Sequence, residues 1–320
     1  MSDAAQTAIV TGAGGFVGRH LTARLAADGW RTVATDVARQ PTPPPATPAH
    51  GEIDQRTLDI RDAEAVTDLI DEVRPDVVFH LAAQASVTQS MREPLEDVMI
   101  NVLGTMNIAT AAVGAEVQRI VYFSTGGALY GEPDRQPVDE DHLPQPTSVY
   151  GASKVAAELY LAVLTAESGT TVSVLRPGNI YGPGQDHTRD YGVVGIFAGR
   201  MLRDESVTIF GDGDESRDYV HVDDIVDAAL AAASGEPATC IVSSGVGTTT
   251  RHIFDLVAAE TGYTEQPRYE PARPSEIRGI ALSPRRAQQR WGWTPGTSIE
   301  EGVRRSVAWY RAQLPGDASG

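Results

Sequence analysis

Two residues near the middle of the chain have the types and spacing of a proton-transfer pair. Lys154 is the only lysine among the 26 Lys and Arg residues of the 320-residue chain, and it follows Tyr150 by four positions. Residues four apart on a helix share one face, and a nearby cation favours the phenolate form of tyrosine. A tyrosine in this setting can serve as a general base near neutral pH. The alternative is a solvent-exposed lysine with no part in chemistry.

A glycine-rich segment follows the first predicted strand, 7–11, and leads into the first predicted helix, 16–28. Its glycines recur at every third position, as Gly-x-x-Gly-x-x-Gly. Such glycines permit a tight turn and let the backbone approach a pyrophosphate that rests on the helix N-terminus. The position after a strand and before a helix therefore predicts a dinucleotide site. Its residues are Gly12, Gly15, Phe16, Val17 and Gly18.

An acidic residue, Asp36, ends the second predicted strand, 32–36, about 20 residues beyond the glycines, where dinucleotide-binding folds place a carboxylate. There it accepts hydrogen bonds from the adenosine ribose and repels the 2′-phosphate of NADP, so the predicted cofactor is NAD. Asp59 and Ile60 end the third predicted strand, 52–60, where they would frame the adenine. The alternative for Asp59 is a helix cap.

These segments belong to a regular alternation of strands and helices through the first half of the chain. The run 76–83 is largely apolar, as in strands that are buried on both faces of a parallel sheet. The alternation predicts an α/β fold, a Rossmann doubly wound parallel sheet with right-handed crossovers. The remaining predicted helices lie at 63–73, 98–113 and 149–167, and the remaining strands at 119–124 and 171–175.

After residue 177 the pattern becomes irregular, with Gly- and Pro-rich turns and short elements that end in a helix at about 300–313. This change predicts a second, smaller and mixed C-terminal lobe. We assign residues 1–177 to the NAD-binding Rossmann domain, with a later return segment at about 219–245. The second lobe is assigned residues 178–218 and 246–320.

Charge and cysteine content restrict the partners. The formal net charge is −17 at pH 7 and the pI is near 4.8, which argues against nucleic-acid or anionic-membrane partners. Cys240 is the only cysteine, so no intramolecular disulfide and no thiolate metal site is expected, and no metal is predicted. The N-terminus lacks the pattern of a signal peptide, and no stretch is expected to be long enough to span a membrane, so a cytoplasmic location is expected.

Ordered blocks along essentially the whole chain resemble the extended short-chain dehydrogenase/reductase superfamily. Within it they are most similar to the NAD-dependent nucleotide-sugar epimerases and dehydratases. The blocks are Thr-Gly-Ala-Gly-Gly-Phe-Val-Gly (11–18), His-Leu-Ala-Ala-Gln (80–84), Asn-Val-Leu-Gly-Thr (101–105), Ser-Thr-Gly-Gly-Ala-Leu-Tyr-Gly (124–131), Tyr150-x-x-x-Lys154, Arg-Pro-Gly-Asn-Ile-Tyr-Gly-Pro (176–183), Gly-Asp-Gly-Asp-Glu-Ser-Arg-Asp-Tyr-Val-His-Val-Asp-Asp (211–224) and Arg273-Pro-Ser-Glu276.

The resemblance implies roles for the matching residues. Tyr150 would be the base, and Lys154 would hold the nicotinamide ribose and lower the pKa of that tyrosine. The second lobe would bind the nucleotide sugar, and family members commonly form homodimers through the long helices 98–113 and 149–167. Further cofactor contacts would come from Ala82, Ala83 and Asn101, and substrate contacts from Asn179, Arg217, Arg273 and Glu276.

One position departs from the family pattern. Epimerases and dehydratases of this kind usually have a serine or threonine four residues before the Tyr-Gly pair at 130–131, where this chain has Gly126. A subset that resembles actinobacterial UDP-glucose 4-epimerases has a Ser/Thr-Gly-Gly run at this point. In that case the catalytic hydroxyl would come from Thr125, or alternatively from Ser124.

The same block indicates which reaction the resemblance implies. Dehydratases of the dTDP-glucose type need an Asp-Glu pair where this chain has Gly127 and Ala128. Epimerisation at C4 needs only one base and one hydride carrier, so we expect a UDP-hexose 4-epimerase of the UDP-glucose/UDP-galactose type. One alternative is a UDP-glucuronate or other nucleotide-sugar epimerase, in which Arg189 would pair with the uronate carboxylate. A less favoured alternative is a catalytically silent NAD-binding protein.

Overall fold

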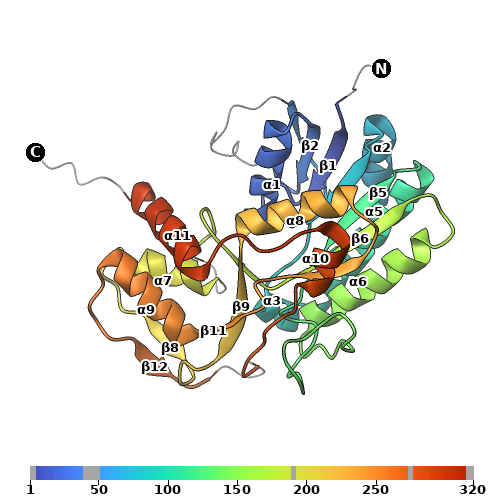
Figure 1. Ribbon diagram of the computed structural model, residues 1–320. Coiled ribbons are helices and arrows are strands. Elements are labelled where there is room, and N and C mark those ends of the chain that lie inside the picture. The colour runs from blue at the N-terminus through green and yellow to red at the C-terminus, as the bar shows by residue number, and fades with distance from the viewer. Residues whose placement is uncertain (1–4, 39–50, 189–191, 273–276, 315–320) are drawn as a thin grey trace, which may run out of the picture.

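Seven strands form one parallel sheet with the order β10-β6-β5-β4-β1-β2-β3 in the computed structural model, which describes residues 5–38, 51–188, 192–272 and 277–314 (Figure 1). The direction of the strand order changes between β1 and β4, which pair with each other in parallel. Ligands of such sheets bind at the carboxyl ends of the strands near this change. The strands are β1 (Thr7–Thr11), β2 (Arg31–Asp36), β3 (Ile53–Thr57), β4 (Val77–His80), β5 (Arg119–Phe123), β6 (Thr171–Pro177) and β10 (Thr239–Val242).

Helices cover both faces of this sheet, as the alternating pattern predicted. In Figure 1, α8 crosses in front of the sheet and α6 lies at the lower right, and the two helices belong to different cores. Each face has its own apolar core, and the largely apolar β4 is buried along its whole length between the two cores. The doubly wound Rossmann-type fold is thereby confirmed. One face is covered by α1 (Phe16–Ala27), α8 (Val222–Ser234) and α10 (Arg285–Trp291), and the other by α2 (Ala63–Val73), α5 (Gly104–Gly114) and α6 (Val149–Thr165).

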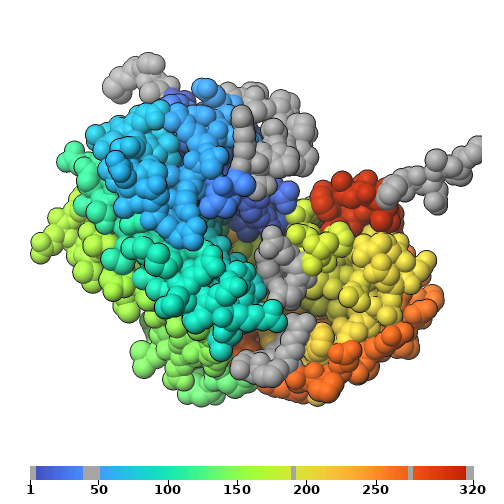
Figure 2. Space-filling view, turned by 180° about the vertical axis from the view of Figure 1, so that it is seen from behind, coloured from blue at the N-terminus to red at the C-terminus, as the bar shows by residue number. Residues whose placement is uncertain are grey.

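A smaller lobe with a separate core stands beside the sheet. In Figure 2 the blue-to-green residues of the first domain and the yellow-to-red residues of this lobe occupy opposite sides of one face of the molecule. Its helices are α7 (Val193–Met201), α9 (Thr250–Thr261) and α11 (Ile299–Gln313); its strands are β7 (Asn179–Tyr181), β8 (Thr208–Phe210), β9 (Ser216–His221), β11 (Gly247–Thr249) and β12 (Arg268–Glu270).

The assignment of all of 246–320 to the second lobe is wrong for the segment around α10. Ala287 and Trp293 belong to the same core as Leu21 and Val226 of the first domain. The indole Nε1 of Trp293 donates a hydrogen bond to the Asp224 carbonyl of α8 at 2.9 Å. The chain therefore returns to the first domain twice, because these apolar side chains match the surface of α8 and β10.

Two boundaries differ from the sequence-based expectation. Strand β3 ends at Thr57, so Asp59 and Ile60 lie beyond it. The helix expected at 98–113 begins earlier and continues through α4 (Pro94–Val98), a π-helical turn η1 (Met99–Leu103) and α5, after a short helix α3 (Val87–Arg92). Propensity does not reveal a π turn, because it depends on hydrogen bonding within the helix and on what the helix packs against.

The expectation that no stretch could span a membrane is wrong by length and composition. Within the described part of the chain, the continuous helix Pro94–Gly114 has 21 residues and a mean hydropathy of 1.2. Half of its most apolar window is buried inside the protein, where α5 packs against α2 and α6. Core helices of α/β domains pass the same test, so this feature is weak evidence for a membrane span.

Candidate active site

The glycine turn between β1 and α1 is shaped so that only glycine fits at two of its positions. Gly12 has a φ of +70°, and a Cβ on it would lie 2.7 Å from the amide nitrogen of Ala82. A Cβ on Gly18 would lie 2.2 Å from the Gly12 carbonyl oxygen. Gly15 precedes the first turn of α1 as its N-cap residue and brings no side-chain cap to it. The backbone and the helix N-terminus thus form a cradle that suits a pyrophosphate.

Asp36 lies directly against this turn, at the carboxyl end of β2. One carboxylate oxygen accepts a hydrogen bond from the Gly14 amide at 2.9 Å, and the other accepts one from the Val37 amide at 2.8 Å. These bonds fix a negative charge beside the cradle, where it fits the ribose hydroxyls of NAD better than a 2′-phosphate. The residues at this end of the sheet therefore fit NAD, which would be held by the turn 12–18 and by Asp36.

Asp59 and Ile60 are engaged within the protein. Arg61 donates hydrogen bonds to the Asp59 carboxylate from its side chain and its amide, and this pairing lowers the pKa of Asp59. The cap of α2 is Asp62, which accepts a bond from Ala65 N at 3.1 Å, so the interpretation of Asp59 as the helix cap is wrong. Ile60 is buried and packs closely against Gly104, because a Cβ on Gly104 would lie only 2.4 Å from the Ile60 Cδ1.

A chain of hydrogen bonds, in which every donor points the same way, runs from the amide of Ala82 to the carbonyl of Asn101. Ala82 N donates to Thr11 Oγ1 (3.2 Å), and Thr11 Oγ1 lies 2.7 Å from His80 Nδ1. His80 Nε2 lies 3.0 Å from Thr105 Oγ1, which donates to the Asn101 carbonyl at 2.6 Å. The order of donors assigns the proton of the neutral imidazole to Nε2. Burial, and then the charge of Lys154, lowers the pKa of His80 to about 3, so this histidine is a structural link.

The side-chain amide of Asn101 is used inside the protein. Its nitrogen donates to the Gln84 carbonyl, to Asp97 Oδ2 and to Ser153 Oγ at 3.0 to 3.1 Å. Its oxygen accepts from Gln84 N at 2.9 Å. Asn101 therefore holds the backbone of Gln84, which follows Ala82 and Ala83. The resemblance had implied instead that Asn101 lines the cofactor.

The Tyr150–Lys154 pair lies in the first turns of α6. Ser148 caps this helix by accepting from Gly151 N at 3.1 Å, and Ser90 Oγ accepts from Tyr150 N at 3.1 Å. Tyr150 is half-buried, whereas Lys154 is only 3% exposed. The Lys154 ammonium lies 4.6 Å from the centroid of the Tyr122 ring, a cation–π contact. The alternative of a solvent-exposed lysine is therefore wrong.

The surroundings of Lys154 adjust its charge. Burial lowers the pKa of Lys154 to about 8, and the carboxylates of Glu158 and Asp97 oppose that shift. At pH 7 the amine is still protonated, and a cation one helical turn from Tyr150 favours its phenolate form. Sequence spacing alone could not show this balance, since it depends on burial and on an acid from another helix.

The hydroxyls of Ser124 and Thr125, just beyond β5, differ in their partners. Ser124 Oγ donates to Glu158 Oε1 at 2.5 Å. No hydrogen bond joins the Thr125 hydroxyl to another described residue, and this side chain is 9% exposed. A Cβ on Gly126 would lie 2.9 Å from Leu282 Cδ1 and 3.0 Å from the Arg176 carbonyl oxygen. Close packing thus accounts for the glycine where the family usually has a hydroxyl.

The substrate-side residues are only partly described. Asn179 is exposed at the start of β7, and a Cβ on Gly127 would lie 3.1 Å from its Oδ1. Arg217 on β9 donates from Nη1 to the carbonyls of Ser216 (2.9 Å) and Ile277 (3.0 Å). The neighbouring Asp218 is buried and accepts bonds from the 243–245 loop and from Leu282 N. Arg189, Arg273 and Glu276 lie outside the described residues.

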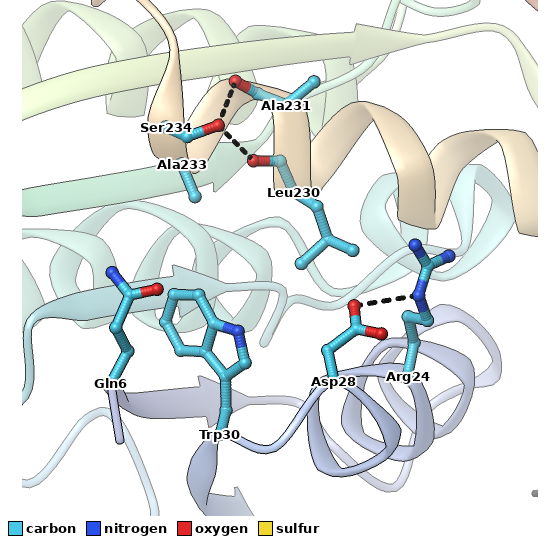
Figure 3. A pocket seen from close by; sticks show the side chains of 8 residues that line it. All are labelled: Gln6, Arg24, Asp28, Trp30, Leu230, Ala231, Ala233 and Ser234. Atoms are coloured by element: carbon cyan, nitrogen blue, oxygen red, sulfur yellow. Dashed lines mark hydrogen bonds and ion pairs between the residues drawn. The ribbon is translucent and has the colours of Figure 1, made fainter. Parts of the chain in front are cut away.

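A separate cavity of about 370 Å³ opens at the opposite end of the sheet (Figure 3). Trp30 and Leu230 face it, and Arg24 is paired with Asp28 at its side. It lies next to the amino ends of β1 and β2, away from the carboxyl ends that carry the residues described above, and is not part of that site. It is lined by Gln6, Arg24, Asp28, Trp30, Leu230, Ala231, Ala233 and Ser234.

Sequence reasoning overlooked several residues that position the site. Glu158 contacts Ser124, and Ser90 holds the backbone of Tyr150. A signal for Glu158 is present, because it is an acid four positions after the only lysine, in a predicted helix that is otherwise largely apolar. Ser90 carries no such signal, since its role depends on the packing of α3 against α6.

Known proteins are similar to this chain over nearly its whole length. Residues 8–239 match the model of the "NAD dependent epimerase/dehydratase family". The UDP-glucose 4-epimerase of Mycolicibacterium smegmatis is 38% identical over 307 residues, which cover 95% of this chain and 98% of that protein.

Solved structures agree in fold and extent. A UDP-glucose 4-epimerase of Thermotoga maritima, solved with UDP-glucose, has a TM-score of 0.92 at 37% identity and covers 97% of this chain and 100% of its own. A UDP-glucose 4-epimerase of Thermus thermophilus, solved with NAD, has a TM-score of 0.88 at 36% identity with the same coverage. Similarity of this extent in sequence and fold, together with the glycine turn and the Tyr150–Lys154 pair, shows that the chain belongs to the NAD dependent epimerase/dehydratase family.

Proposed function

We propose that this protein is a UDP-hexose 4-epimerase that interconverts UDP-glucose and UDP-galactose with bound NAD. The observation that carries the proposal is the buried Lys154 one turn after Tyr150, next to a turn that has no acid or base at Gly127 and Ala128. This set can move one proton at a sugar hydroxyl but has no side chains for elimination. The names of the similar proteins and the bound UDP-glucose and NAD in two solved structures support the same reaction and substrate.

In this reaction each of five side chains of the site has its own role. NAD, when bound, supplies the hydride acceptor and donor for C4. Tyr150 as phenolate removes the proton from the C4 hydroxyl, and returns it after the 4-keto sugar has presented its other face. The Lys154 ammonium stabilises the phenolate, and the Thr125 hydroxyl hydrogen-bonds to the C4 oxygen. Asn179 and Arg217 bind the nucleotide part of the substrate.

The test is to incubate the purified protein separately with UDP-glucose, UDP-N-acetylglucosamine and UDP-glucuronate, without added reductant, and to separate the products by chromatography. We expect conversion of UDP-glucose to UDP-galactose. A strong preference for UDP-glucuronate would replace the hexose proposal by the uronate alternative. Conversion of none of them by protein that retains NAD would contradict the proposal and favour another sugar or a catalytically silent protein.

Thr125 is expected to supply the hydroxyl that contacts the C4 oxygen. Thr125→Val keeps the shape and removes the donor, which should lower kcat by about 10²-fold, because such a bond strengthens as charge develops on the oxygen. Thr125→Ser keeps the hydroxyl and should retain most of the rate. Steady-state kinetics with UDP-glucose checks this, and equal rates for the valine and serine variants would refute the role.

We also propose that the protein forms a homodimer through an apolar surface on α3, α4, η1 and α6. Eight of the twelve exposed large apolar side chains of the described residues lie on these four elements, which pack against one another. Apolar patches of this extent are typical of interfaces, and long helices from two subunits can pair as a four-helix bundle. The eight residues are Val87, Met91, Leu95, Val98, Met99, Leu159, Tyr160 and Val163.

A double variant, Leu159→Asp and Val163→Asp, should convert the dimer into a monomer. These side chains are 64% and 74% exposed, so the folded subunit tolerates charge at both positions, whereas buried unpaired carboxylates at an interface are strongly unfavourable. Size-exclusion chromatography with light scattering gives the mass. Leu143→Asp is the matched control, because Leu143 is 78% exposed outside this surface and should leave the dimer intact. A monomeric wild-type protein would contradict the proposal.

A further inference from the structure

A buried carboxylate that has no role in the reaction above joins three parts of the site. Glu158 lies on α6, one helical turn beyond Lys154. Its Oε1 accepts from Ser124 Oγ at 2.5 Å and from Arg176 Nε at 3.1 Å, and its Oε2 accepts from Arg176 Nη2 at 2.5 Å. The Glu158 and Arg176 side chains are only 11% and 10% exposed, so this charge-assisted pair is shielded from solvent.

Arg176 connects this carboxylate to the other end of the turn 124–130, which begins at Ser124. Its Nη1 donates to the Tyr130 hydroxyl at 2.8 Å, and Tyr130 is itself buried. Burial raises the pKa of Tyr130 to about 12, so the phenol remains neutral. Glu158 thus holds the first residue of the turn 124–130, Ser124, directly, and it holds the last residue, Tyr130, through the bond from Arg176 to the tyrosine hydroxyl. Thr125 lies between these two anchors.

The backbone of the turn is fixed against a different element. Ser124 N donates to the Leu175 carbonyl at 2.8 Å, and Gly126 N donates to the Pro177 carbonyl at 2.6 Å. These bonds tie the turn to β6. The Glu158 bonds tie the turn to α6, the helix that carries Tyr150 and Lys154. These bonds therefore help to set the distance between Thr125 on the turn and the catalytic pair on α6.

From the geometry of these contacts we infer that Glu158 is a positioning residue, which holds the Thr125 hydroxyl at a fixed place relative to Tyr150 and Lys154. The inference rests on the proposed function, because it concerns how that reaction's groups are aligned. Small displacements of reacting groups are costly, since a misplacement of 1 Å can lower a rate by about 10²-fold.

Glu158 also contributes charge at the lysine. Together with Asp97 of α4 it opposes the effect of burial on the pKa of Lys154. The other titratable groups around the amine are His80 on β4, which is neutral, and the phenols of Tyr122 on β5 and Tyr150. Loss of the Glu158 charge should therefore let Lys154 lose its proton at a lower pH, and the alkaline decline of kcat should begin earlier.

The test compares Glu158→Gln, Ser124→Ala and the double variant with UDP-glucose as substrate. Glu158→Gln should lower kcat by about 10²-fold with KM little changed, because alignment and not binding is lost. Ser124→Ala should cost less. The double variant should be no worse than Glu158→Gln, since Ser124 acts through that carboxylate.

Glu140→Gln is the matched control. Glu140 is also a buried acid with an amide partner, Ile241 N, and a nearby arginine, Arg286, but its contacts are with β10 and α10. It should lower the melting temperature and leave kcat and its pH profile unchanged. If Glu158→Gln also changed only the melting temperature, the role of Glu158 would be structural and the inference would be overturned.

A second measurement does not depend on the sugar. The phenolate of Tyr150 is followed by ultraviolet absorbance in the NAD-bound protein, with Tyr150→Phe as the baseline. Glu158→Gln should move this titration to higher pH, because a lysine that has lost its proton no longer favours the phenolate, and Glu140→Gln should not move it. If the wild-type protein converted no UDP-sugar, the proposed function would fail, while an unmoved titration would refute the influence of Glu158 by itself.

Discussion

Replacement of Tyr150 by phenylalanine is expected to abolish turnover of UDP-glucose, with a loss of about 10³- to 10⁴-fold, while NAD remains bound. The variant lacks only the hydroxyl that exchanges a proton with the C4 oxygen. His80 cannot replace it, because both of its ring nitrogens are engaged and its pKa is near 3. The glycine turn and Asp36, which would hold the cofactor, are untouched by the change.

Two measurements on the purified variant check this result. Conversion of UDP-glucose gives the rate, and release of NAD by denaturation gives its occupancy. Tyr263→Phe is the control, because that hydroxyl lies in the second lobe and donates to the Glu205 carbonyl at 3.1 Å; its rate should match the wild type. A Tyr150→Phe protein that kept a tenth of the wild-type rate would exclude Tyr150 as the base.

Replacement of Lys154 by arginine is expected to fail almost as badly, although the charge is kept. The ammonium occupies a buried space 4.6 Å above the Tyr122 ring. A guanidinium is larger, planar and differently hydrated, so it cannot take the same place. We expect a loss of at least about 10²-fold in kcat, since loss of one correctly placed donor at an active site typically costs that much.

The pH dependence separates the two side chains at position 154. With a pKa near 8, Lys154 is protonated below that pH and becomes neutral above it. The wild-type rate should therefore decline as the pH rises through about 8, because the neutral amine no longer favours the Tyr150 phenolate. An arginine stays charged at every accessible pH, so the residual rate of Lys154→Arg should lack this decline. A similar decline in both proteins would assign it to another group.

The parts of the site that sequence could predict are those set by local backbone chemistry. Gly12 is favoured by its φ of +70°, Gly18 by its close approach to the Gly12 carbonyl oxygen, and the spacing of Tyr150 and Lys154 depends only on their common helix. Asp36 is likewise fixed by its place at the end of a strand that follows a readable helix. Such features depend on residues close in sequence, which a pattern can represent.

The parts that sequence could not predict depend on contacts between distant segments. His80 is hydrogen-bonded to partners 69 and 25 positions away, and Ser124 is held by Glu158, 34 positions away. The sequence therefore leaves open whether Ser124 or Thr125 supplies the catalytic hydroxyl. In the same way, the sequence pattern of α10 does not show which lobe its apolar side chains pack against. Only the packing of α10 in the core with α8 assigns it to the first domain.

The burial of the only lysine also determines how the folded protein reacts with amine-specific reagents. Lys154 is 3% exposed, and the single cysteine, Cys240, is fully buried with a pKa raised to about 12. An amine-reactive dye should therefore attach to the folded protein at the α-amino group, and a thiol-reactive dye should find no open target. Slow modification of Lys154 would then require local opening of α6, so its rate would measure how often the catalytic helix separates from the sheet.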